Sequence, residues 1–416
     1  MQLKKLGALW PHLRQHPLYA ARLAKYPKAT WDAFRSLPLL TKSDIQPDNE
    51  RSPSKLFTLP RDRYTRLHQT SGSRGFPMPV LDTNDDWRWW LACWQSVLDA
   101  ADVNHSDVAM MAFSFGPFIG FWTAHEALIQ RGVLVVPGGG LSSEARLELM
   151  IRQRCTVVCC TPTYALHLAS IARQQSLDLA GSSVRTLIVA GEPGGSVPAV
   201  ADAISEQWNA RVVDHAGASE MGAWGFATDR DDGLHVLETE FIAEFRRCDT
   251  DDEMQFWTAD QAGREPEKNP QCELVLSNLG RFGGPLMRYR TGDLVRPRWD
   301  HSHSCPMVKL DRGVLGRADD MMVIRGVNVF PSSIEAIIRE REPTVEFRMI
   351  ATRENALDDL RIEIECDDDA CRSLAMHLRD RLAMRVTVTS VPQGSLPRSE
   401  AKSKRWIDRR ESKLDA

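Results

Sequence analysis

The sequence of 416 residues is longer than one compact domain usually needs, so it predicts two or more structural units. Hydrophobic residues make up 43% and charged residues 26%, a composition that excludes a disordered or fibrous protein. The net charge of −4, from 52 basic and 56 acidic residues, gives no basic excess that would indicate nucleic acid as a partner.

Targeting signals and membrane spans are not expected. Residues 1–26 mix Lys, Arg and His among apolar positions, unlike a secretory signal. No run of about 18 apolar residues occurs, so we expect no membrane-spanning helix. The nine cysteines are scattered, and Cys159 and Cys160 fall in an apolar run typical of a buried strand. These features predict a reduced, cytoplasmic protein.

Apolar runs typical of strands alternate with stretches of helical character through the first three quarters of the chain. Strands are expected at 108–113, 133–136, 156–160, 184–190 and 210–214, and helices at 123–131, 142–153 and 164–174. Alternation of this kind predicts α/β units around a largely parallel sheet. In such sheets, ligands bind at the carboxyl ends of the strands.

The pattern changes near Gly316. Strands are expected at 321–324, 345–352, 360–365 and 385–391, and helices at 332–340 and 370–382. Ser332 and Ser333 are candidate N-caps of the first of these helices. We therefore predict an α/β protein with a large N-terminal part, built of mixed and parallel sheets flanked by helices, and a small α+β C-terminal domain of about 100 residues.

The first loop that suggests chemistry is 68–77. Its glycines allow backbone N–H groups to converge on a phosphate, and Thr70, Ser71 and Ser73 add hydroxyl donors. It is not a Walker P-loop, because no Gly-Lys-Ser/Thr ends it. A Ser/Gly-rich turn without a ligand is the alternative interpretation.

Two further loops follow segments with strand character. A Gly-Glu-Pro turn at 191–193 can present its backbone to a planar base, or it can simply lead into the next helix. In segment 214–222, Glu220 lies among small residues, where a carboxylate can hold the Mg²⁺ of a triphosphate. The alternative there is a helix N-terminus with Ser219 as its N-cap.

Three more motifs lie toward the C-terminus. In segment 287–294, Asp293 follows a Thr-Gly pair, and its carboxylate can accept hydrogen bonds from both hydroxyls of a ribose. The alternative is an ordinary β-turn aspartate. Segment 316–331 is the longest motif, and the basic segment 396–405 would otherwise be a solvated tail. Each motif is ambiguous alone, but their order and spacing are not.

Taken together, the motifs resemble the adenylate-forming (acyl/aryl-CoA synthetase) superfamily, and most closely its phenylacetate–CoA ligase branch. The resemblance spans nearly the whole chain, from Leu-Pro-Leu-Leu-Thr-Lys-Ser-Asp at 37–44 to Arg-Ser-Glu-Ala-Lys at 398–402. Segment 316–331 is the motif most specific to that branch. The resemblance implies an adenylation domain at 1–317 and a mobile lid domain at 318–416, with the hinge near Asp319.

The resemblance implies an ATP-dependent ligase that activates an aryl or other hydrophobic acid as acyl-AMP, releases pyrophosphate and transfers the acyl group to a thiol. Coenzyme A is the expected acceptor, with a carrier protein's phosphopantetheine, an amine or another small nucleophile as alternatives. A non-catalytic nucleotide-binding homologue is the second hypothesis, because Arg74 and Phe76 replace the family's usual Thr and Lys. An NAD-dependent oxidoreductase is disfavoured because no Gly-x-Gly-x-x-Gly links a first strand to a helix. A homodimer is a possible assembly.

The resemblance also implies site residues. Catalytic roles fall to Lys402, Glu220 and Arg317, with Glu220 as the Mg²⁺ ligand and Lys402 as the lysine that contacts the acyl carboxylate and the α-phosphate. Lys404 is a second candidate, because Ser-Glu-Ala-Lys replaces the usual Ser-x-Gly-Lys. The implied ATP-binding residues are Thr70, Ser71, Gly72, Ser73, Gly75, Gly191, Glu192, Pro193, His215, Ala216, Gly217, Ser219, Asp293 and Arg317.

An acid pocket is implied at Phe113, Phe115, Gly116 and Ala218, where aromatic walls suit a flat or otherwise hydrophobic acid. The alternative is that these aromatic side chains are simply part of the core.

Members of the branch often carry a structural zinc. The residues offered here are His235, His303 and Cys305, with Asp229 nearby and the usual upstream cysteine missing. A degenerate site with surface histidines is the alternative.

Overall fold

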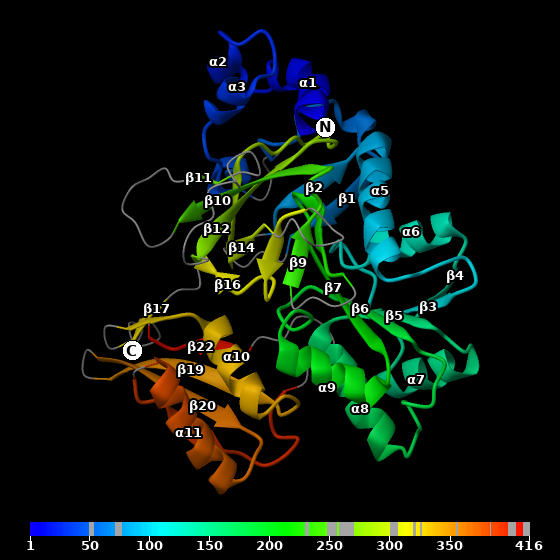
Figure 1. Ribbon diagram of the computed structural model, residues 1–416, viewed down its shortest axis with the longest axis vertical. Helices are drawn as coiled ribbons and strands as arrows, with labels where there is room; N and C mark the ends of the chain where they lie inside the picture. The colour runs from blue at the N-terminus through cyan, green and yellow to red at the C-terminus, as the bar shows by residue number, and fades with distance from the viewer. Residues whose placement is uncertain are drawn as a thin grey trace.

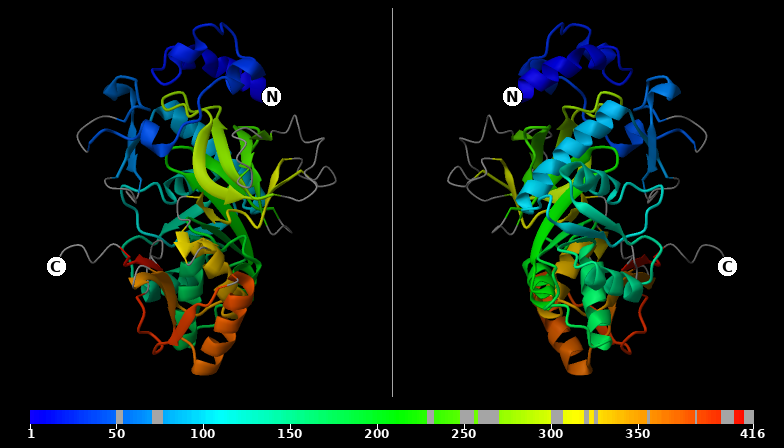
Figure 2. Two further views of the ribbon diagram at one scale, coloured as in Figure 1. Left: turned by 90° about the vertical axis from the view of Figure 1, so that its left-hand side faces the viewer. Right: turned by 90° about the vertical axis from the view of Figure 1, so that its right-hand side faces the viewer.

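The computed structural model describes residues 1–49, 54–70, 77–228, 233–247, 256–257, 270–299, 307–318, 322–324, 327–354, 357–382, 384–397 and 405–410. The N-terminal helices lie at one end of the molecule, and the C-terminal strands and helices lie at the other (Figures 1 and 2). The largest sheet lies between them. None of the helices in these ranges is long and apolar enough to span a membrane.

The central sheet contains nine of the described strands, in the order β14-β15-β9-β8-β7-β6-β5-β3-β4. Strands β4, β3, β5, β6 and β7 run parallel, and the rest of the sheet is antiparallel. The bounds are β3 (Val108–Met111), β4 (Leu134–Pro137), β5 (Val157–Cys160), β6 (Thr186–Ala190), β7 (Arg211–Ala218), β8 (Gly222–Phe226), β9 (Gly233–Val236), β14 (Pro297–Arg298) and β15 (Lys309–Asp311). The predicted parallel sheet is thus confirmed, and its antiparallel half makes the sheet mixed.

Helices cover both faces of the parallel strands. Their bounds are α5 (Asn84–Ala100), α6 (Trp122–Arg131), α7 (Ser143–Arg152), α8 (Pro162–Gln174) and α9 (Pro198–Trp208). Along β5, Val157 and Cys159 belong to the core beneath α5 and α6, whereas Val158 and Cys160 belong to the core beneath α7, α8 and α9. A strand that is buried on both faces is continuously apolar, so β5 could be predicted from the sequence.

A second sheet packs beside the first in the order β11-β10-β12-β13-β16 and is antiparallel throughout. A short hairpin, β1 and β2, precedes α5. The bounds are β1 (Arg66–Gln69), β2 (Pro79–Asp82), β10 (Phe241–Arg247), β11 (Phe256–Trp257), β12 (Cys272–Asn278), β13 (Tyr289–Val295) and β16 (Gly316–Arg317). The N-terminal elements are α1 (Gln2–Leu13), α2 (Ala20–Leu23), α3 (Trp31–Arg35), α4 (Lys42–Ile45) and the 3₁₀ turn η1 (Arg61–Arg63).

We call the described residues between 322 and 410 the C-terminal unit. It has a core of its own, formed by its helices and strands. Its four-stranded sheet has the order β21-β20-β19-β22, and β17 pairs with β18. The bounds are β17 (Met322–Ile324), β18 (Val327–Val329), α10 (Pro331–Arg341), β19 (Phe347–Glu354), β20 (Leu357–Ile364), α11 (Asp368–Leu382), β21 (Thr387–Ser390) and β22 (Trp406–Asp408). The boundary between residues 317 and 318 stays a prediction.

The predicted serine caps of α10 are wrong. The N-cap is Phe330, no side chain caps the helix, and Ser332 and Ser333 lie inside its first turn. Pro331 occupies the first helical position, where its fixed φ favours a helix and its missing N–H costs nothing. The proline therefore starts the helix one residue earlier than the serines suggested.

Candidate functional site

Thr70 lies at the end of β1, at the base of the predicted phosphate loop. Its backbone N–H donates to Met78 O (3.0 Å), and its Oγ1 accepts from Met78 N (3.1 Å), which closes the hairpin to β2. Gln69 N donates to Pro117 O (2.7 Å), so the base of this loop lies against the loop that follows β3. The remaining predicted phosphate-loop residues are outside the described ranges: Ser71, Gly72, Ser73, Arg74, Gly75 and Phe76.

The Gly-Glu-Pro turn at 191–193 lies at the carboxyl end of β6 and leads into α9, and its contact with a planar base stays a prediction. Gly191 has a φ of +96°, a value that favours glycine. Glu192 Oε1 accepts a hydrogen bond from Thr163 N (2.8 Å), at the start of α8. Later in the loop, Ser196 Oγ donates to Asp214 Oδ2 (2.5 Å), which ties the loop to β7.

The interpretation of Ser219 as a helix N-cap is wrong. Strand β7 continues to Ala218, and Ser219 and Glu220 form the turn that leads into the antiparallel strand β8. Glu220 is 8% exposed, and its Oε1 accepts a hydrogen bond from Tyr289 Oη (2.9 Å). Burial first, and then the nearby Glu220 carboxylate, raise the pKa of Tyr289, so its hydroxyl remains a donor.

Arg281 fixes the backbone of the Glu220 turn, a role that no sequence pattern predicted. Its Nη1 donates to Glu220 O (2.6 Å) and to Ser219 O (3.0 Å), and its Nη2 lies 2.7 Å from Asp82 Oδ1. Both side chains of this ion pair are fully buried. Burial raises the pKa of Asp82 to about 6, although the Arg281 guanidinium opposes the shift. A buried guanidinium is tolerated only with such partners, which orient it rigidly.

Asp293 lies within β13, so its interpretation as a turn residue is wrong. Where β13 pairs with β12, the register shifts between Glu273 and Val275, and Asp293 lies on the bulged side. Thr291 Oγ1 donates to Leu274 O (2.9 Å) and accepts from Asp293 N (3.0 Å). Such a bulge re-aims a side chain without ending the strand.

Arg317 pairs with Asp293, as the assignment of both residues to the ribose requires. The two are register partners across β13 and β16, and Arg317 Nη1 donates to Asp293 Oδ1 (2.9 Å) and to Thr291 O (2.7 Å). Both side chains are only partly buried. The Asp293 carboxylate is thus oriented while 16% of its side chain is exposed.

The predicted acid-pocket aromatics lie in the loop after β3 and contact one another. The ring centroids of Phe113 and Phe115 are 4.6 Å apart, and Phe115 meets the Trp122 ring edge-on at 4.5 Å. Trp122 Nε1 donates to Gly116 O (3.0 Å), which closes the loop. A Cβ on Gly139 would lie 3.2 Å from the Phe115 ring, so the loop after β4 also borders this cluster.

Aromatic contacts connect this loop to β7. Phe113 packs on Phe121 at 5.3 Å, Phe121 on Trp94 at 6.3 Å, and Trp94 on His215 at 4.3 Å. His215 Nδ1 lies 2.7 Å from Gly225 O, and burial lowers the pKa of His215 to about 4. The imidazole is therefore neutral at pH 7 and serves as a packing group.

Ala216 and Ala218 pack against the same core as Phe113 and Phe115. Gly217 lies between the two alanines and is exposed. A Cβ on Gly217 would lie 3.0 Å from Gly222 O, so the chain is closely packed at this point, and the role of Ala218 in an acid pocket stays a prediction.

Several predicted residues fall outside the described ranges: Lys402, Lys404, Asp319, His303, Cys305, His301 and Asp229. His235 is described. It is buried in β9, with Nδ1 3.3 Å from Met307 O and Nε2 3.5 Å from Thr228 Oγ1. Among the described residues, no group of three or more His, Cys, Asp or Glu could hold a metal ion. The zinc site therefore stays a prediction.

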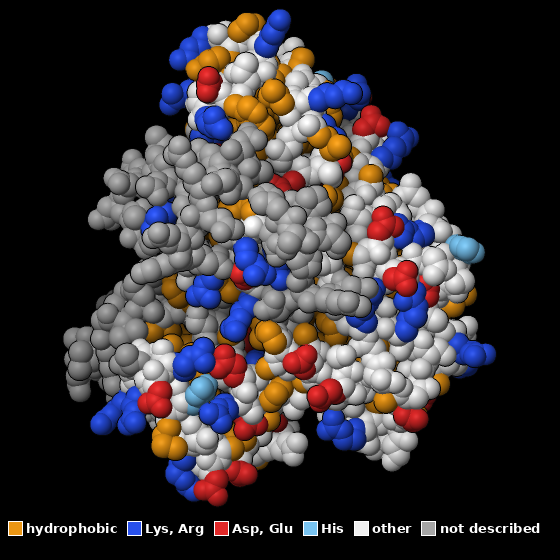
Figure 3. Space-filling view, viewed as in Figure 1, with side chains coloured by type: hydrophobic (Ala, Val, Ile, Leu, Met, Phe, Trp, Pro, Cys, Tyr) orange, Lys and Arg blue, Asp and Glu red, His pale blue; other side chains and the backbone are white. Residues whose placement is uncertain are grey.

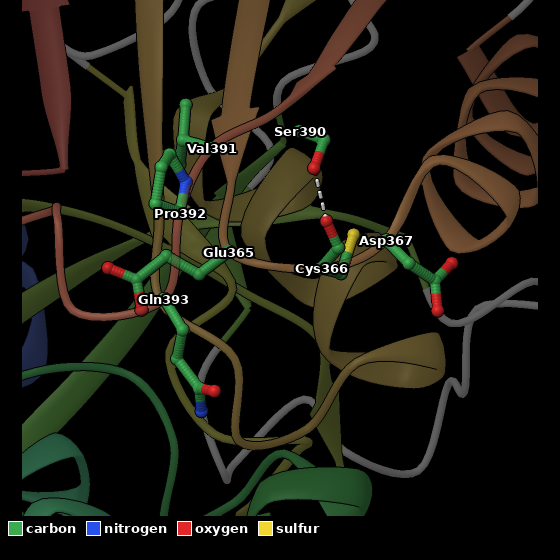
Figure 4. A pocket seen from close by; sticks show the side chains of 7 residues that line it. All are labelled: Glu365, Cys366, Asp367, Ser390, Val391, Pro392 and Gln393. Atoms are coloured by element: carbon green, nitrogen blue, oxygen red, sulfur yellow. Dashed lines mark hydrogen bonds between the residues drawn. The ribbon is translucent and has the colours of Figure 1, made fainter.

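A separate pocket of about 470 Å³ lies in the C-terminal unit (Figure 4). Its lining residues follow β20 and β21: Glu365, Cys366, Asp367, Ser390, Val391, Pro392 and Gln393. None of them belongs to the loops that carry the predicted site. The pocket is wide open, and its walls offer few apolar side chains for a hydrophobic acid.

Sequence profiles of two families match this chain. The profile of the AMP-binding enzymes matches residues 32–239, and that of the AMP-binding enzyme C-terminal domain matches residues 326–410. Among curated relatives, the phenylacetate-coenzyme A ligase of Escherichia coli (strain K12) is 28% identical over 393 residues. The alignment covers 91% of this chain and 85% of that relative.

Solved structures of a 2-hydroxyisobutyryl-CoA ligase share the fold. The structure in the postadenylation state, in complex with R3-HIB-AMP, superposes with a TM-score of 0.85 at 24% identity and covers 99% of this chain and 89% of its own. The structure in the thioesterification state, with 2-HIB-AMP and CoA, gives a TM-score of 0.69 at 24% identity and covers 98% and 89%. Both are structures of one protein in two states, and this chain superposes better on the first.

Proposed function

Because this chain belongs to the AMP-binding enzyme family, we propose that it is an ATP-dependent acid–thiol ligase. In this proposal, it activates an aryl or other hydrophobic carboxylic acid as its acyl-AMP with release of pyrophosphate. It then transfers the acyl group to the thiol of coenzyme A. Similarity over most of its length to a phenylacetate-coenzyme A ligase supports both half-reactions.

The observation that carries the proposal is that β13 holds one carboxylate and carries another. Glu220 is held by the hydroxyl of Tyr289 at the start of this strand, and Asp293 is held by Arg317 farther along it. Glu220, strand β13 and Arg317 are far apart in the sequence. In this proposal, Glu220 would hold the metal ion of the nucleotide and Asp293 would bind its ribose.

Glu220 suits Mg²⁺, because its carboxylate oxygens are hard ligands and Tyr289 occupies only one of them. When bound, Mg²⁺ would offset the negative charge of the triphosphate. Asp293 accepts hydrogen bonds from the ribose hydroxyls, and Arg317 orients the Asp293 carboxylate. The Gly-Glu-Pro turn at 191–193 borders the adenine, together with Ala216 and Gly217.

The adenylation step joins two anions, so positioning and charge neutralisation account for most of its catalysis. The acid carboxylate attacks the α-phosphorus of ATP, the bond to the bridging oxygen breaks, and pyrophosphate leaves. We propose that Lys402 contacts both the carboxylate and the α-phosphate. On the face shown in Figure 3, Lys and Arg side chains gather near β14 and β16, which suits an anionic ligand.

The acid pocket is proposed at Phe113, Phe115, Gly116 and Ala218. Half-buried aromatic rings that pack at an angle to one another offer apolar walls, which favour an aryl acid over a charged or strongly polar one. The same loop touches the base of the phosphate loop through Gln69 and Pro117, which would place the acid beside the triphosphate.

Acid-dependent exchange of labelled pyrophosphate into ATP tests the first half-reaction. We expect exchange with at least one aryl acid in a panel of aryl and alkyl acids, and its loss when Mg²⁺ is removed. The Lys402→Ala variant should slow exchange by roughly 100-fold or more while transfer from preformed acyl-AMP persists, whereas Lys404→Ala should retain exchange. Absence of exchange with every acid, alongside tight ATP binding, would instead favour a non-catalytic nucleotide-binding protein.

The acceptor is tested by mass spectrometry of the products. We expect a CoA thioester, and the alternatives are an acylated carrier protein or an amide.

Zinc bound by His235, His303 and Cys305 is tested by metal analysis of the purified protein, with His235→Ala as the comparison. A homodimer is tested by light scattering. The cytoplasmic location is part of the proposal, because the described cysteines are all free thiols, as a reducing compartment requires.

A further inference from the structure

Arg405 lies in the C-terminal tail, directly before β22, and is 7% exposed. Its guanidinium is held inside the C-terminal unit by two carboxylates. Nε donates to Glu346 Oε1 (2.7 Å), and Nη1 donates to Glu335 Oε1 (2.8 Å). The guanidinium also lies over the Phe347 ring, 5.1 Å from its centroid. These contacts fix its direction.

The same guanidinium reaches across to the N-terminal part of the chain. Its Nη2 donates to Thr163 Oγ1 (3.4 Å), in the first turn of α8. The backbone N–H of Thr163 donates in turn to Glu192 Oε1 (2.8 Å), in the turn proposed to border adenine. One threonine therefore contacts both the tail arginine and the adenine turn. Burial lowers the pKa of Arg405, but nearby carboxylates that include Glu335 and Glu192 raise it above its usual value.

The contacts of Arg405 differ in what a movement of the C-terminal unit would do to them. Glu335, Glu346 and Phe347 belong to α10, β19 and the segment between them, so they would move with Arg405. Thr163 belongs to α8 and would stay behind. Helices α9 and α10 lie next to each other at this junction (Figure 1). The contact with Thr163 therefore depends on the present arrangement of the two parts.

The present arrangement superposes better on the postadenylation structure of the related ligase than on its thioesterification structure, with TM-scores of 0.85 and 0.69. The contact between Arg405 and Thr163 thus belongs to an arrangement like that of the postadenylation structure. Arg405 also lies three positions after Lys402 in the sequence. An anchor at Arg405 shortens the tail that must be ordered when the lysine acts.

We propose that Arg405 is a positioning residue for the adenylation half-reaction, which anchors the tail to Thr163 and the adenine turn in one arrangement of the two parts. This inference rests on the proposed ligase function. Arg405 itself is not assigned any contact with the reacting atoms. Its contribution is selective, because a contact present in one arrangement accelerates only the step that uses that arrangement.

The two half-reactions separate this role from a general effect on folding. Arg405→Lys cannot bridge two carboxylates and a hydroxyl at once, and Thr163→Val removes only the hydroxyl acceptor. We expect pyrophosphate exchange to fall about 10-fold or more in Arg405→Lys and about 3-fold in Thr163→Val, because a hydrogen bond from a charged donor is lost. Thr163→Ser should restore exchange. Thioester formation from preformed acyl-AMP should remain within about 2-fold of wild type in all three variants.

Arg410→Lys is the matched control. Arg410 also lies in the tail, and its guanidinium pairs with Asp358 and Asp408 inside the C-terminal unit. Loss of that pairing should leave both half-reactions unchanged. The inference would be overturned if Thr163→Val slowed both half-reactions equally. It would also be overturned if pyrophosphate exchange stayed at the wild-type rate in both Arg405→Lys and Thr163→Val. Either result would leave the ligase function standing.

Amide hydrogen exchange provides a readout that does not need activity. Without ATP or acid, residues 162–165 and 191–193 should exchange faster in Arg405→Lys and Thr163→Val than in wild type, and Arg410→Lys should match wild type. If no acid supports pyrophosphate exchange in wild type, the ligase function fails, and this measurement still decides whether Arg405 anchors the adenine turn. Unchanged hydrogen exchange in both variants would show that it does not.

Discussion

Glu220 illustrates how a single carboxylate is held at the residue scale. The Tyr289 hydroxyl fixes one of its oxygens, and the buried Arg281 fixes its backbone carbonyl. Neither support was visible in the sequence. Arg281 is paired with Asp82 through a contact between distant segments, and Tyr289 lies in the recognised motif at 287–294, which gave no sign of its contact with Glu220. Tertiary contacts of single side chains leave no periodic trace, so the sequence identified Glu220 but not what orients it.

The Tyr289→Phe variant should weaken Mg²⁺-dependent adenylation. It removes the donor to Glu220 and leaves the ring in place, so we expect about a 10-fold loss of pyrophosphate exchange and a higher half-saturating Mg²⁺ concentration. Tyr19→Phe is the control, because it deletes another buried hydroxyl, which donates to Pro285 O at 2.9 Å, away from Glu220. An unchanged Mg²⁺ dependence in Tyr289→Phe would mean that the hydroxyl does not position the metal ligand.

The Asp293→Asn variant should raise the KM for ATP. An amide offers one acceptor oxygen instead of two and loses the charge that pairs with Arg317, so we expect about a 10-fold or greater increase with a smaller change in kcat. The ATP dependence of pyrophosphate exchange measures both. Asp311→Asn is the matched control, because Asp311 also pairs with an arginine, Arg298, across neighbouring strands but outside the site. A similar KM in the two variants would contradict the ribose assignment.

At the scale of elements, the sequence predicted best where burial is symmetrical. The apolar run of β5 was recognised because both faces of the strand are buried, and α6, α7 and α8 were recognised by their helical character, whereas the bounds of α5 and α9 were not predicted. The extent of a strand was predicted least well where a neighbouring strand determines it. Strand β7 continues past Asp214 because β8 folds back on it, and β13 continues through Asp293 because a bulge absorbs the Thr-Gly pair. Pairing and register depend on the partner strand, which local patterns do not contain.

Strand β7 should give the protein a pH dependence that traces to Asp214. Burial raises the pKa of this carboxyl from 3.8 to about 7, although the Ser196 hydroxyl opposes the shift. The folded protein therefore holds this proton more tightly than the unfolded chain. Its stabilising contribution is complete below about pH 4 and is lost as the pH rises through about 7, with a slope of at most about 1.4 kcal/mol per pH unit.

Urea unfolding of wild type and Asp214→Asn at several pH values measures this contribution. The difference between their free energies of unfolding should shift in favour of the variant as the pH rises from about 4 to about 7 and then level off, because other groups cancel in the comparison. Ser196→Ala should extend the window to higher pH, since the removed hydroxyl, which donates to Asp214 Oδ2, lowers the pKa of Asp214. A difference that stays constant with pH would contradict the burial argument.

At the scale of the whole molecule, the chain has a separable core in its C-terminal unit. The buried residues of that core come from β17 through β21, with Trp406 of β22 packed against it, and none comes from the N-terminal part. The unit meets the rest of the chain through α10, which lies against α9 and β16, and through Arg405, which contacts Thr163. We propose that the unit moves at this junction between the two half-reactions.

A fragment of residues 318–416 should therefore fold alone. Its core contains apolar side chains from a four-stranded sheet and two helices, which is enough for a small independent domain. We expect one cooperative thermal transition by circular dichroism. A fragment of residues 331–416 is the matched control, because it lacks β17 and β18, whose Ile324 and Val329 are buried in that core. Deleting two such side chains costs about 2–5 kcal/mol each, a large share of the stability of a domain this size, so the shorter fragment should lose its cooperative transition. If 318–416 unfolded without a transition, the C-terminal unit would not be an independent domain. If 331–416 were equally stable, the predicted boundary between residues 317 and 318 would be wrong.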